Sequence, residues 1–381
     1  MTKTTIGIVG TSRKENEHRV PIHPDHLDRI APARRTRLAF EEGYGRRFGV
    51  ADEEIEAAGS SLATREELLR DCEIVILPKP TAADLREVRK GGVVWGWPHC
   101  VQQRELTQIA IDRELTLIAW EAMFQWSRTG TRGVHVFARN NELAGYCGIL
   151  DALRLRGVDG AYGPRQRVAV LGFGSVSRGA ASALQGRGFS DLTVFTQRPP
   201  HLVRDRLFGA RHLQMRRTGE NGAMEAVDAA GNATPLAEAL GGFDVIANGT
   251  LQDPERPVMY LGEGDEDRLR PGCLIVDVSC DRGMGFPFAR PTSFEDPTFR
   301  AGPATYYAVD HTPSYLYAAA SWEISEALLP YLPAVMGGSE AWQSNETVRR
   351  AIEIRDGRVV NPTILSFQDR EPEYPHRFRL L

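Results

Sequence analysis

The chain has 381 residues, about two to three times the length of a typical domain, and 42% of them are hydrophobic. Two globular domains with sizeable cores are therefore expected, without disulfide staples. The net charge of −4 arises from 46 Lys and Arg against 50 Asp and Glu, without long runs of like charge, so neither nucleic acid nor an anionic membrane surface is an expected partner.

The first part of the chain alternates β-rich runs with helical stretches. Buried strands are predicted where β-branched and apolar residues cluster, at 5–10, 73–77, 92–95 and 116–119. Apolar residues recur at helical spacing between them, at 65–70 and 103–114. Strands that alternate with helices predict an α/β fold with a parallel sheet, and this first unit extends to about residue 138.

A long helix is predicted over 141–156, and the domain boundary is placed near it. The strand–helix rhythm then repeats, with strands expected at 167–171, 192–196, 244–247 and 274–278. Residues 217–232 are polar and rich in glycine, which predicts a surface excursion. A helix over 314–329 is stopped by Pro330, and the step at residues 356–357 is typical of a hairpin.

The strongest local motif lies where the strand at 167–171 runs into a glycine-containing turn and then a helix. In this setting Gly172 makes the tight turn and Gly174 lets the backbone approach a pyrophosphate. Ser175 and Val176 open the helix, whose free N–H groups attract phosphate. A small residue, Ser177, takes the place of the usual third glycine. A dinucleotide site is predicted here, the alternative being a purely structural turn.

The end of the second strand in this unit bears on which cofactor binds. NAD sites usually carry Asp or Glu there, whereas this chain has Thr196 and Arg198. No carboxylate would repel a 2′-phosphate and Arg198 can pair with one, which favours NADPH, with NAD still possible. The alternative is that Arg198 is an ordinary exposed loop residue. Asn248 and Gly249 follow another strand, where the ribose or nicotinamide would lie; a plain loop is the alternative.

Four residues that could take part in catalysis follow predicted strands. Arg19 lies in the polar loop after the first strand, and Lys79, His99 and Asp281 each come after a later one. Reduction of a C=O or C=N bond needs a cation for a substrate carboxylate, a proton donor or acceptor, and a group that holds the amine. Each residue alone is more often a surface charge or a structural histidine. Because the carboxyl ends of parallel strands meet at one edge of a sheet, the joint pattern indicates a catalytic site.

Other features restrict the cellular setting and the chemistry. The five cysteines are odd in number and lack a C-x-x-C spacing, which suits a reducing compartment. Neither a signal peptide nor a membrane-spanning run is seen, so a cytoplasmic location is expected. The histidines lack metal-ligand spacing, so no metal is predicted. A homo-oligomer is expected by analogy with other α/β dehydrogenases.

The sequence resembles the alanine dehydrogenase and lysine-forming saccharopine dehydrogenase superfamily over nearly its whole length. The resemblance is carried by Glu17-His-Arg19-Val20, Lys79-Pro80, the segment around His99, Trp120-Glu121, the Gly172 loop and Asp277-Val-Ser-Cys-Asp281. Within the superfamily the chain is most similar to the carboxyethyl-ornithine synthases. The motifs for this are Arg139–Gly145, Cys280–Phe286 and Tyr307–Leu316.

The resemblance implies two Rossmann-like domains with parallel sheets that flank an inter-domain cleft. Residues 1–140 with 315–381 would form the substrate and catalytic domain, and residues 141–314 the NAD(P)-binding domain. Arg19 and Lys79 would bind the keto acid, and His99 would act as general acid and base. Asp281 would lie beside the nicotinamide. The amino-acid co-substrate would be bound by Arg139, Asn140, Glu142 and His311.

The function implied is that of an NADPH-dependent, opine-type oxidoreductase. Such an enzyme condenses a basic amino acid, ornithine or lysine, with an α-keto acid such as pyruvate and reduces the imine. Alanine dehydrogenase or saccharopine dehydrogenase activity is the alternative within the same class. A non-catalytic NADP(H)-binding protein is a third hypothesis, which the set of Arg19, Lys79, His99 and Asp281 argues against.

Overall fold

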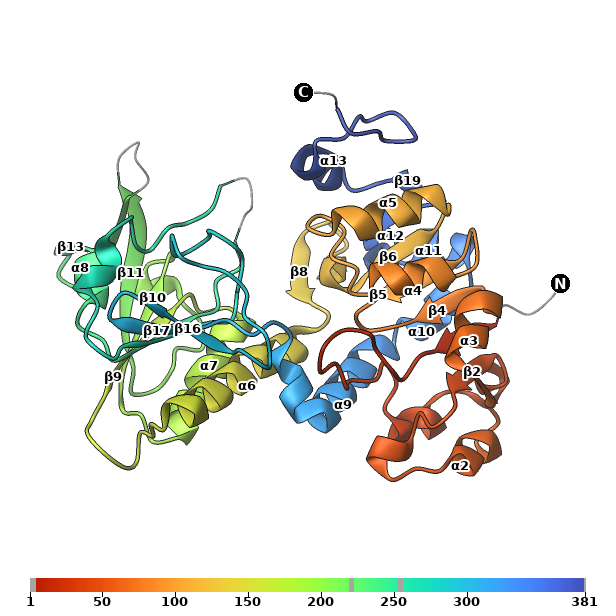
Figure 1. Ribbon diagram of the computed structural model, residues 1–381, viewed down its shortest axis with the longest axis horizontal. Coiled ribbons are helices and arrows are strands. Elements are labelled where there is room, and N and C mark those ends of the chain that lie inside the picture. The colour runs from red at the N-terminus through yellow and green to blue at the C-terminus, as the bar shows by residue number, and fades with distance from the viewer. Residues whose placement is uncertain (1–4, 219–222, 253–255, 380–381) are drawn as a thin grey trace. The chain divides into compact units, whose positions relative to one another are not determined.

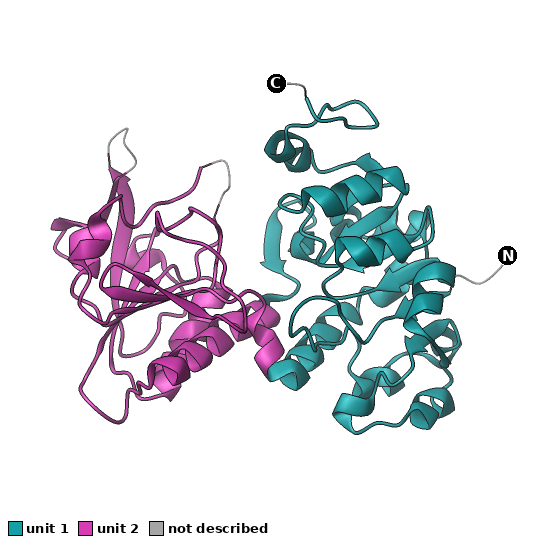
Figure 2. Ribbon diagram, viewed as in Figure 1, with its two compact units in different colours: residues 1–138, 316–381 teal, residues 139–315 magenta. Residues whose placement is uncertain are grey.

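A computed structural model describes residues 5–218, 223–252 and 256–379 (Figure 1). The chain forms two compact units (Figure 2). Unit 1 comprises the chain up to Ala138 and again from Leu316 onward, and unit 2 comprises Arg139–Tyr315. Each unit is built on a sheet whose central strands are parallel, so the predicted α/β class with two Rossmann-like units is confirmed.

The sheet of unit 1 has the order β19-β18-β6-β5-β4-β1-β2-β3. Strands β1 to β6 are parallel to one another, and they follow the Rossmann order 3-2-1-4-5-6. Its strands are β1 (Ile6–Ile8), β2 (Leu38–Glu41), β3 (Ser61–Ala63), β4 (Ile74–Ile76), β5 (Val93–Gly96), β6 (Thr116–Ala119), β18 (Ile352–Arg355) and β19 (Arg358–Val359). The hairpin expected at residues 356–357 joins β18 to β19, and β18 pairs antiparallel with β6.

Helices cover both faces of this sheet because its strands are apolar on both sides. One face packs against Ile324 and Leu328, and the other against Leu68 and Leu106. The helices are α1 (Pro32–Arg35), α2 (Asp52–Ala57), α3 (Arg65–Asp71), α4 (Ala82–Glu87), α5 (Arg104–Asp112), α9 (Tyr317–Leu328), α10 (Leu332–Met336), α11 (Ser339–Ser344), α12 (Glu346–Arg350) and α13 (Pro362–Gln368). A small hairpin consists of β7 (Phe124–Trp126) and β8 (Arg132–His135).

The sheet of unit 2 has the order β13-β12-β11-β10-β9-β14-β15-β17-β16. Its parallel centre again follows the 3-2-1-4-5-6 order, with antiparallel strands at both edges. The strands are β9 (Arg167–Leu171), β10 (Asp191–Thr196), β11 (Arg211–Thr218), β12 (Ala223–Val227), β13 (Ala233–Pro235), β14 (Val245–Asn248), β15 (Leu274–Asp277), β16 (Thr298–Ala301) and β17 (Ala304–Tyr307).

The prediction of a surface excursion over residues 217–232 is wrong at 217–218 and 223–227, which lie in strands, whereas residues 228–232 form an exposed connection. β11 and β12 form a hairpin that extends the sheet, and Met215 and Met224 are buried beneath it. Polar side chains on the outer face of these strands interrupt the apolar pattern by which strands are predicted from sequence. Pairing within the sheet satisfies the backbone N–H and C=O groups of both strands. Residues 219–222, which fall within this prediction, lie outside the described residues.

The helices of unit 2 are α6 (Ala138–Arg156), α7 (Ser175–Gly186) and α8 (Leu236–Leu240). The first two cross closely, because a Cβ on Gly145 would lie 1.9 Å from the carbonyl oxygen of Val176. This contact holds the start of α7 in place behind the turn that follows β9. Across the described residues no helix combines the length and apolarity needed to cross a bilayer.

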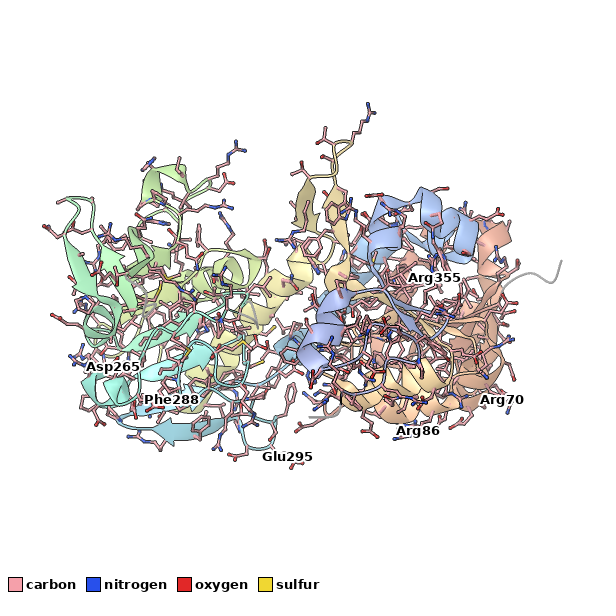
Figure 3. The ribbon with its side chains drawn as sticks, turned by 90° about the horizontal axis from the view of Figure 1, so that it is seen from above. Arg70, Arg86, Asp265, Phe288, Glu295 and Arg355 are labelled. Carbon is pink, nitrogen blue, oxygen red and sulfur yellow. The ribbon has the colours of Figure 1, made fainter. Side chains whose placement is uncertain are left out.

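Charged side chains lie on the exterior of both units (Figure 3). Arg70 and Arg86, which are labelled there, belong to unit 1 and form exposed ion pairs with Asp71 and Glu105. Exposed pairs of this kind contribute little to stability, about 0–1 kcal/mol each. The fold therefore depends on the apolar faces of its sheets.

Candidate functional site

Lys79 and His99 come together at the carboxyl ends of β4 and β5, which are parallel neighbours. The Lys79 Nζ lies 3.0 Å from the His99 Nε2. Gly96, at the end of β5, allows the segments that follow β4 and β5 to approach each other closely. A Cβ at this position would lie only 1.9 Å from the carbonyl oxygen of Leu77. The structure thus brings together two of the predicted catalytic residues.

His99 has an unusual backbone, with φ at +47° in the left-handed region. Its N–H donates to the Glu121 Oε1 at 2.6 Å, and its carbonyl accepts from the N–H groups of Gln102 and Gln103 at 3.1 and 3.0 Å. These bonds offset the strain of a conformation that non-glycine residues rarely adopt. The strained turn fixes the direction in which the imidazole leaves the sheet.

Glu121 is a residue of the site that was not predicted to act there. Its carboxylate also lies 3.7 Å from the His99 Nδ1. Burial and the nearby charge of Glu353 raise the pKa of Glu121 to about 8. The His135 Nδ1 accepts the Phe137 N–H, so its Nε2 donates to the Glu121 carbonyl at 3.2 Å. Glu121 follows β6 directly, and this position could have identified it.

Arg19 is buried, and Glu17 holds its guanidinium. The Arg19 Nε donates to the Glu17 Oε1 at 2.8 Å, and a second guanidinium nitrogen bonds the other carboxylate oxygen. The guanidinium also lies 5.0 Å from the centre of the Trp97 ring. Arg19 is therefore fixed in place before any substrate binds.

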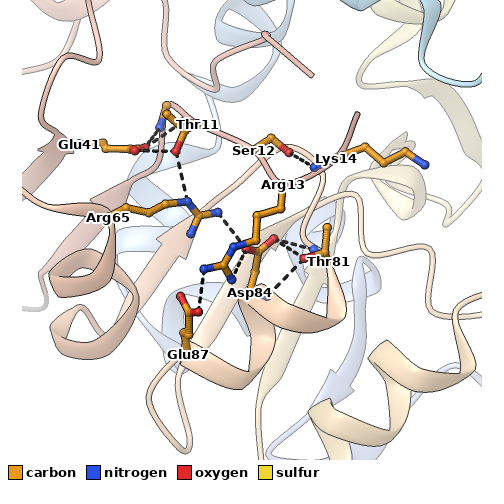
Figure 4. Close-up of polar contacts among 10 residues, drawn as sticks. Thr11, Ser12, Arg13, Lys14, Glu41, Arg65, Thr81, Asp84 and Glu87 are labelled. Atoms are coloured by element: carbon orange, nitrogen blue, oxygen red, sulfur yellow. Dashed lines mark hydrogen bonds and ion pairs between the residues drawn. The ribbon is translucent and has the colours of Figure 1, made fainter. Parts of the chain in front are cut away.

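A second glycine-containing loop follows β1 in unit 1, at the position equivalent to a phosphate-binding turn, but a carboxylate closes it (Figure 4). The Glu41 Oε2 accepts the N–H groups of Gly10 and Thr11 at 2.7 and 2.8 Å. Arg65 donates to the Thr11 hydroxyl and, with Arg13, binds Asp84. These backbone donors are already used, so a phosphate would meet a carboxylate there.

The equivalent turn in unit 2 has the shape that a dinucleotide phosphate requires. Gly172 has φ at +79°, and a Cβ there would lie 2.8 Å from the Thr250 hydroxyl oxygen. Gly174 caps α7 without a side-chain hydrogen bond, and a Cβ on it would meet nothing within 4 Å. The first N–H groups of α7, from Ser175 and Val176, have no carbonyl within their helix to bind. The residues present fit a pyrophosphate.

Ser177 occupies the position of the third glycine and is fully buried. Its hydroxyl donates to the Leu171 carbonyl at 2.9 Å, which satisfies it against the end of β9. A Cβ on Gly249 would lie 2.7 Å from this hydroxyl. The β14 loop therefore packs directly on the start of α7, and Gly249 has to be small.

β10 ends at Thr196 and Arg198 follows it, so no carboxylate stands at the end of this strand. The Thr196 hydroxyl donates to the Arg198 carbonyl at 2.7 Å, and the Arg198 side chain is exposed. Arg178, on α7, donates to the carbonyls of Arg204 and Asp205 and lies over the Phe173 ring at 4.0 Å. The segment after β10 is thus held against the helix that follows the Gly172 turn.

Asn248 is fixed by Asp277, a buried carboxylate that was not predicted to act in the site. The Asn248 side chain donates to the Asp277 Oδ1 at 2.9 Å, and the Tyr306 hydroxyl donates to its Oδ2 at 2.5 Å. Ser279 and Cys280 donate their N–H groups to the same carboxylate at 3.1 and 3.2 Å. Burial raises the pKa of Asp277 to about 6. Asp277 therefore organises the loop that carries Asp281.

Asp281 and His311 both lie near the carboxylate of Asp310. Burial and the charge of Asp310 raise the pKa of Asp281. The His311 Nδ1 lies 3.3 Å from the Asp310 carboxylate, and its ring contacts Phe294. Within unit 2 the structure thus gathers two predicted site residues, Asp281 and His311, around Asp310.

Arg139, Asn140 and Glu142 occupy the first turn of α6. Arg139 and Glu142 form an ion pair with each other across three positions, and Asn140 is buried. Among the described residues, no group of three or more His, Cys, Asp or Glu side chains is arranged to hold a metal ion.

Comparison with known proteins places these features in context. The alanine dehydrogenase/PNT family matches at residues 8–144 through its N-terminal domain and at residues 153–362 through its C-terminal domain. The N(5)-(carboxyethyl)ornithine synthase of Clostridium botulinum is 26% identical over 328 residues, covering 82% of this chain and 89% of that protein.

The alanine dehydrogenase of Mycolicibacterium smegmatis is 23% identical over 373 residues, covering 93% of this chain and 95% of that protein. A solved L-alanine dehydrogenase superposes with a TM-score of 0.75 at 21% identity, covering 96% of this chain and 99% of that one. At this identity the structural likeness concerns the fold alone. The matches confirm the resemblance seen in the sequence motifs.

Proposed function

The chain belongs to the alanine dehydrogenase/PNT family and is an NAD(P)-dependent oxidoreductase, and from this we propose that it reductively joins a basic amino acid to an α-keto acid. Ornithine or lysine supplies the amine, pyruvate supplies the carbonyl, and NADPH is the reductant. The observation that carries the proposal is the 3.0 Å contact between the Lys79 Nζ and the His99 Nε2, a proton-transferring pair at the ends of adjacent strands.

The chemistry balances with one proton. The amine nitrogen attacks the keto carbon, the carbonyl oxygen leaves as water, and the resulting imine is reduced to a secondary amine. When bound, the reduced nicotinamide supplies the hydride. Lys79 donates a hydrogen bond to the keto oxygen, and His99 accepts the proton that the amine loses and returns one to the departing oxygen. The keto-acid carboxylate pairs with Arg19, which Glu17 holds in place.

A cationic co-substrate suits the acidic groups of unit 2. Burial raises the pKa of Asp281, and the negative charge of Asp310 raises it further. The second amine of ornithine or lysine would offset both effects by Coulomb attraction. Ammonia carries no second amine to place there, which favours an amino acid as the nitrogen donor. Arg139, Asn140, Glu142 and His311 are proposed to bind that amino acid.

NADPH is the proposed cofactor, bound by unit 2. Gly172, Gly174, Ser175 and Val176 hold the pyrophosphate. The 2′-phosphate would lie near Thr196 and Arg198, where no carboxylate repels it. Asn248 and Gly249 line the nicotinamide side. Unit 1 offers no equivalent, because Glu41 occupies its turn.

Incubation with pyruvate, ornithine and NADPH, followed by cofactor absorbance and mass spectrometry, tests the proposal. We expect oxidation of NADPH and a product in which a 1-carboxyethyl group replaces one amine hydrogen of ornithine. A matrix of lysine, ammonia, 2-oxoglutarate and NADH separates the opine product from alanine and saccharopine. Cofactor binding without turnover in any combination would support a non-catalytic protein instead.

A further inference from the structure

The turn that carries His99 is bound by a side chain from the C-terminal part of unit 1. Gln368, the last residue of α13, is only 1% exposed, and its amide donates to the Cys100 carbonyl at 2.6 Å. The same amide nitrogen lies 3.2 Å from the Val101 carbonyl. Both carbonyls precede α5 and lie outside the hydrogen-bond ladder of that helix. Gln368 thus binds the two residues that directly follow His99.

A second buried donor reaches the same carbonyl. The Thr107 hydroxyl, on α5, donates to the Cys100 carbonyl at 2.8 Å, and Thr107 is fully buried. The Gln368 amide nitrogen also lies 3.3 Å from the Thr107 hydroxyl oxygen, which can accept through a lone pair. Side chains from two separate helices therefore converge on one backbone oxygen and fix its position.

Arg370 decides which way the Gln368 amide faces. A guanidinium can only donate hydrogen bonds, and the Gln368 Oε1 accepts the Arg370 Nε at 2.7 Å. The Gln368 oxygen therefore points toward Arg370, and its NH2 group points toward Cys100. Arg370 is itself fully buried and donates to the Gln108 amide oxygen at 2.7 Å and to the His376 carbonyl at 3.0 Å. Reversal of the amide would leave a buried N–H without its acceptor, which is unfavourable.

We propose that Gln368 is a positioning residue for the proposed reaction: by binding the backbone beyond His99, it keeps the imidazole within reach of the Lys79 amine. The left-handed backbone of His99 is strained, and such a conformation persists only where its surroundings fix it. Glu121 fixes the turn at the His99 N–H, and Gln368 with Thr107 fixes it one residue later. The catalytic role rests on the proposed function, whereas the hold on the turn does not.

The alternative is that Gln368 only fastens the C-terminal segment to unit 1. Gln368→Met separates the two roles, because methionine has a similar length but no amide. We expect kcat with pyruvate and ornithine to fall by up to about 100-fold, while the Kd for NADPH, the proposed ligand of unit 2, stays unchanged. In a His99→Asn background the same substitution should cause no further loss, since no imidazole is left to be positioned. An equal loss in both backgrounds, or an unchanged kcat in the folded single variant, overturns the proposal.

Thr107→Val decides the matter if Gln368→Met fails to fold. Valine has the shape of threonine without its hydroxyl, so this variant removes one donor to the Cys100 carbonyl and keeps the bond between Gln368 and Arg370. A smaller loss of kcat that disappears in the His99→Asn background supports the proposal, and an unchanged kcat overturns it. Gln125→Met, at an exposed position of β7 in the same unit, is the matched control and should leave kcat unchanged.

The imidazole signal of His99 provides a readout that needs no turnover. It is recorded by NMR on protein that contains ¹⁵N-labelled histidine and is assigned by its absence in His99→Asn. Because the His99 Nε2 contacts the Lys79 Nζ, we expect this signal to shift in Gln368→Met and to stay unchanged in Gln125→Met. An unmoved signal in Gln368→Met overturns the hold on the turn. Absence of turnover in the wild type overturns the proposed function and leaves the NMR signal to decide whether Gln368 positions His99.

Discussion

A Cβ on Gly179 would lie 1.8 Å from the carbonyl oxygen of Glu142, where α7 crosses α6. Gly179→Ala must therefore push the two helices apart, and overpacking of this kind costs about 1–3 kcal/mol. We expect the free energy of unfolding to fall by this amount and the affinity for NADPH to weaken, because α7 begins directly after the Gly172 turn. Denaturant titration and fluorescence titration with NADPH measure the two effects.

Gly186, near the end of the same helix, is the matched control. A Cβ there meets nothing within 4 Å, so Gly186→Ala should be neutral or stabilising by up to about 1 kcal/mol. Equal destabilisation by both substitutions would show that the crossing of α6 and α7 is not the cause.

His99→Asn separates the role of the imidazole from the role of the backbone. Asparagine tolerates the left-handed conformation of this position, so the fold should be retained. Loss of a general acid and base should lower kcat by about 10²- to 10⁴-fold. Circular dichroism and steady-state kinetics check the two expectations, with His201→Asn, in a short turn of unit 2, as the control. Retained activity in His99→Asn would exclude His99 as the proton carrier.

Arg198→Ala tests the choice of cofactor. Loss of a charge-assisted bond to a phosphate costs about 1.5–3 kcal/mol, so the Kd for NADPH should rise about tenfold or more while that for NADH changes little. Isothermal titration calorimetry with both cofactors measures this. Arg165→Ala, an exposed arginine that donates to Ser190, should leave both values unchanged. A parallel loss for NADH would indicate that Arg198 does not contact the 2′-phosphate.

Glu121 should make the stability of the protein depend on pH. Its pKa is raised to about 8 in the folded state, whereas the unfolded chain releases this proton above about pH 4.3. The folded state therefore binds more protons in this window, and the free energy of unfolding falls as pH rises, by up to about 1.4 kcal/mol per pH unit. The stability is fully present below about pH 4 and is lost up to about pH 8.

Denaturant titrations at pH 7 and pH 8 check this expectation, because Asp277, with a pKa of about 6, has already released most of its proton at pH 7. Glu121→Gln should flatten the slope between these two pH values, since its amide oxygen still accepts the His99 N–H. A slope that survives the substitution would have to come from another group.

The sequence predicted the parts of the fold and site that depend on local patterns. Alternating strands and helices revealed the α/β class, and the run into Gly172 and Gly174 marked the turn before α7. The position of Lys79 and His99 directly after strands predicted that they would meet, since the carboxyl ends of parallel strands share an edge. Glu121 obeys the same rule and could have been found by it. The edge strands β11 and β12 were missed because their outward residues are polar.

By itself the sequence determined which segments become strands and helices and which residues stand at strand ends, because hydrophobic periodicity and turn chemistry act over a few neighbouring residues. Only the tertiary structure decided that Glu41 closes the turn of unit 1 and that Gln368 binds the Cys100 carbonyl from 268 positions along the chain. Such partners are set by strand order and by the path of the C-terminal segment, and no local spacing encodes either.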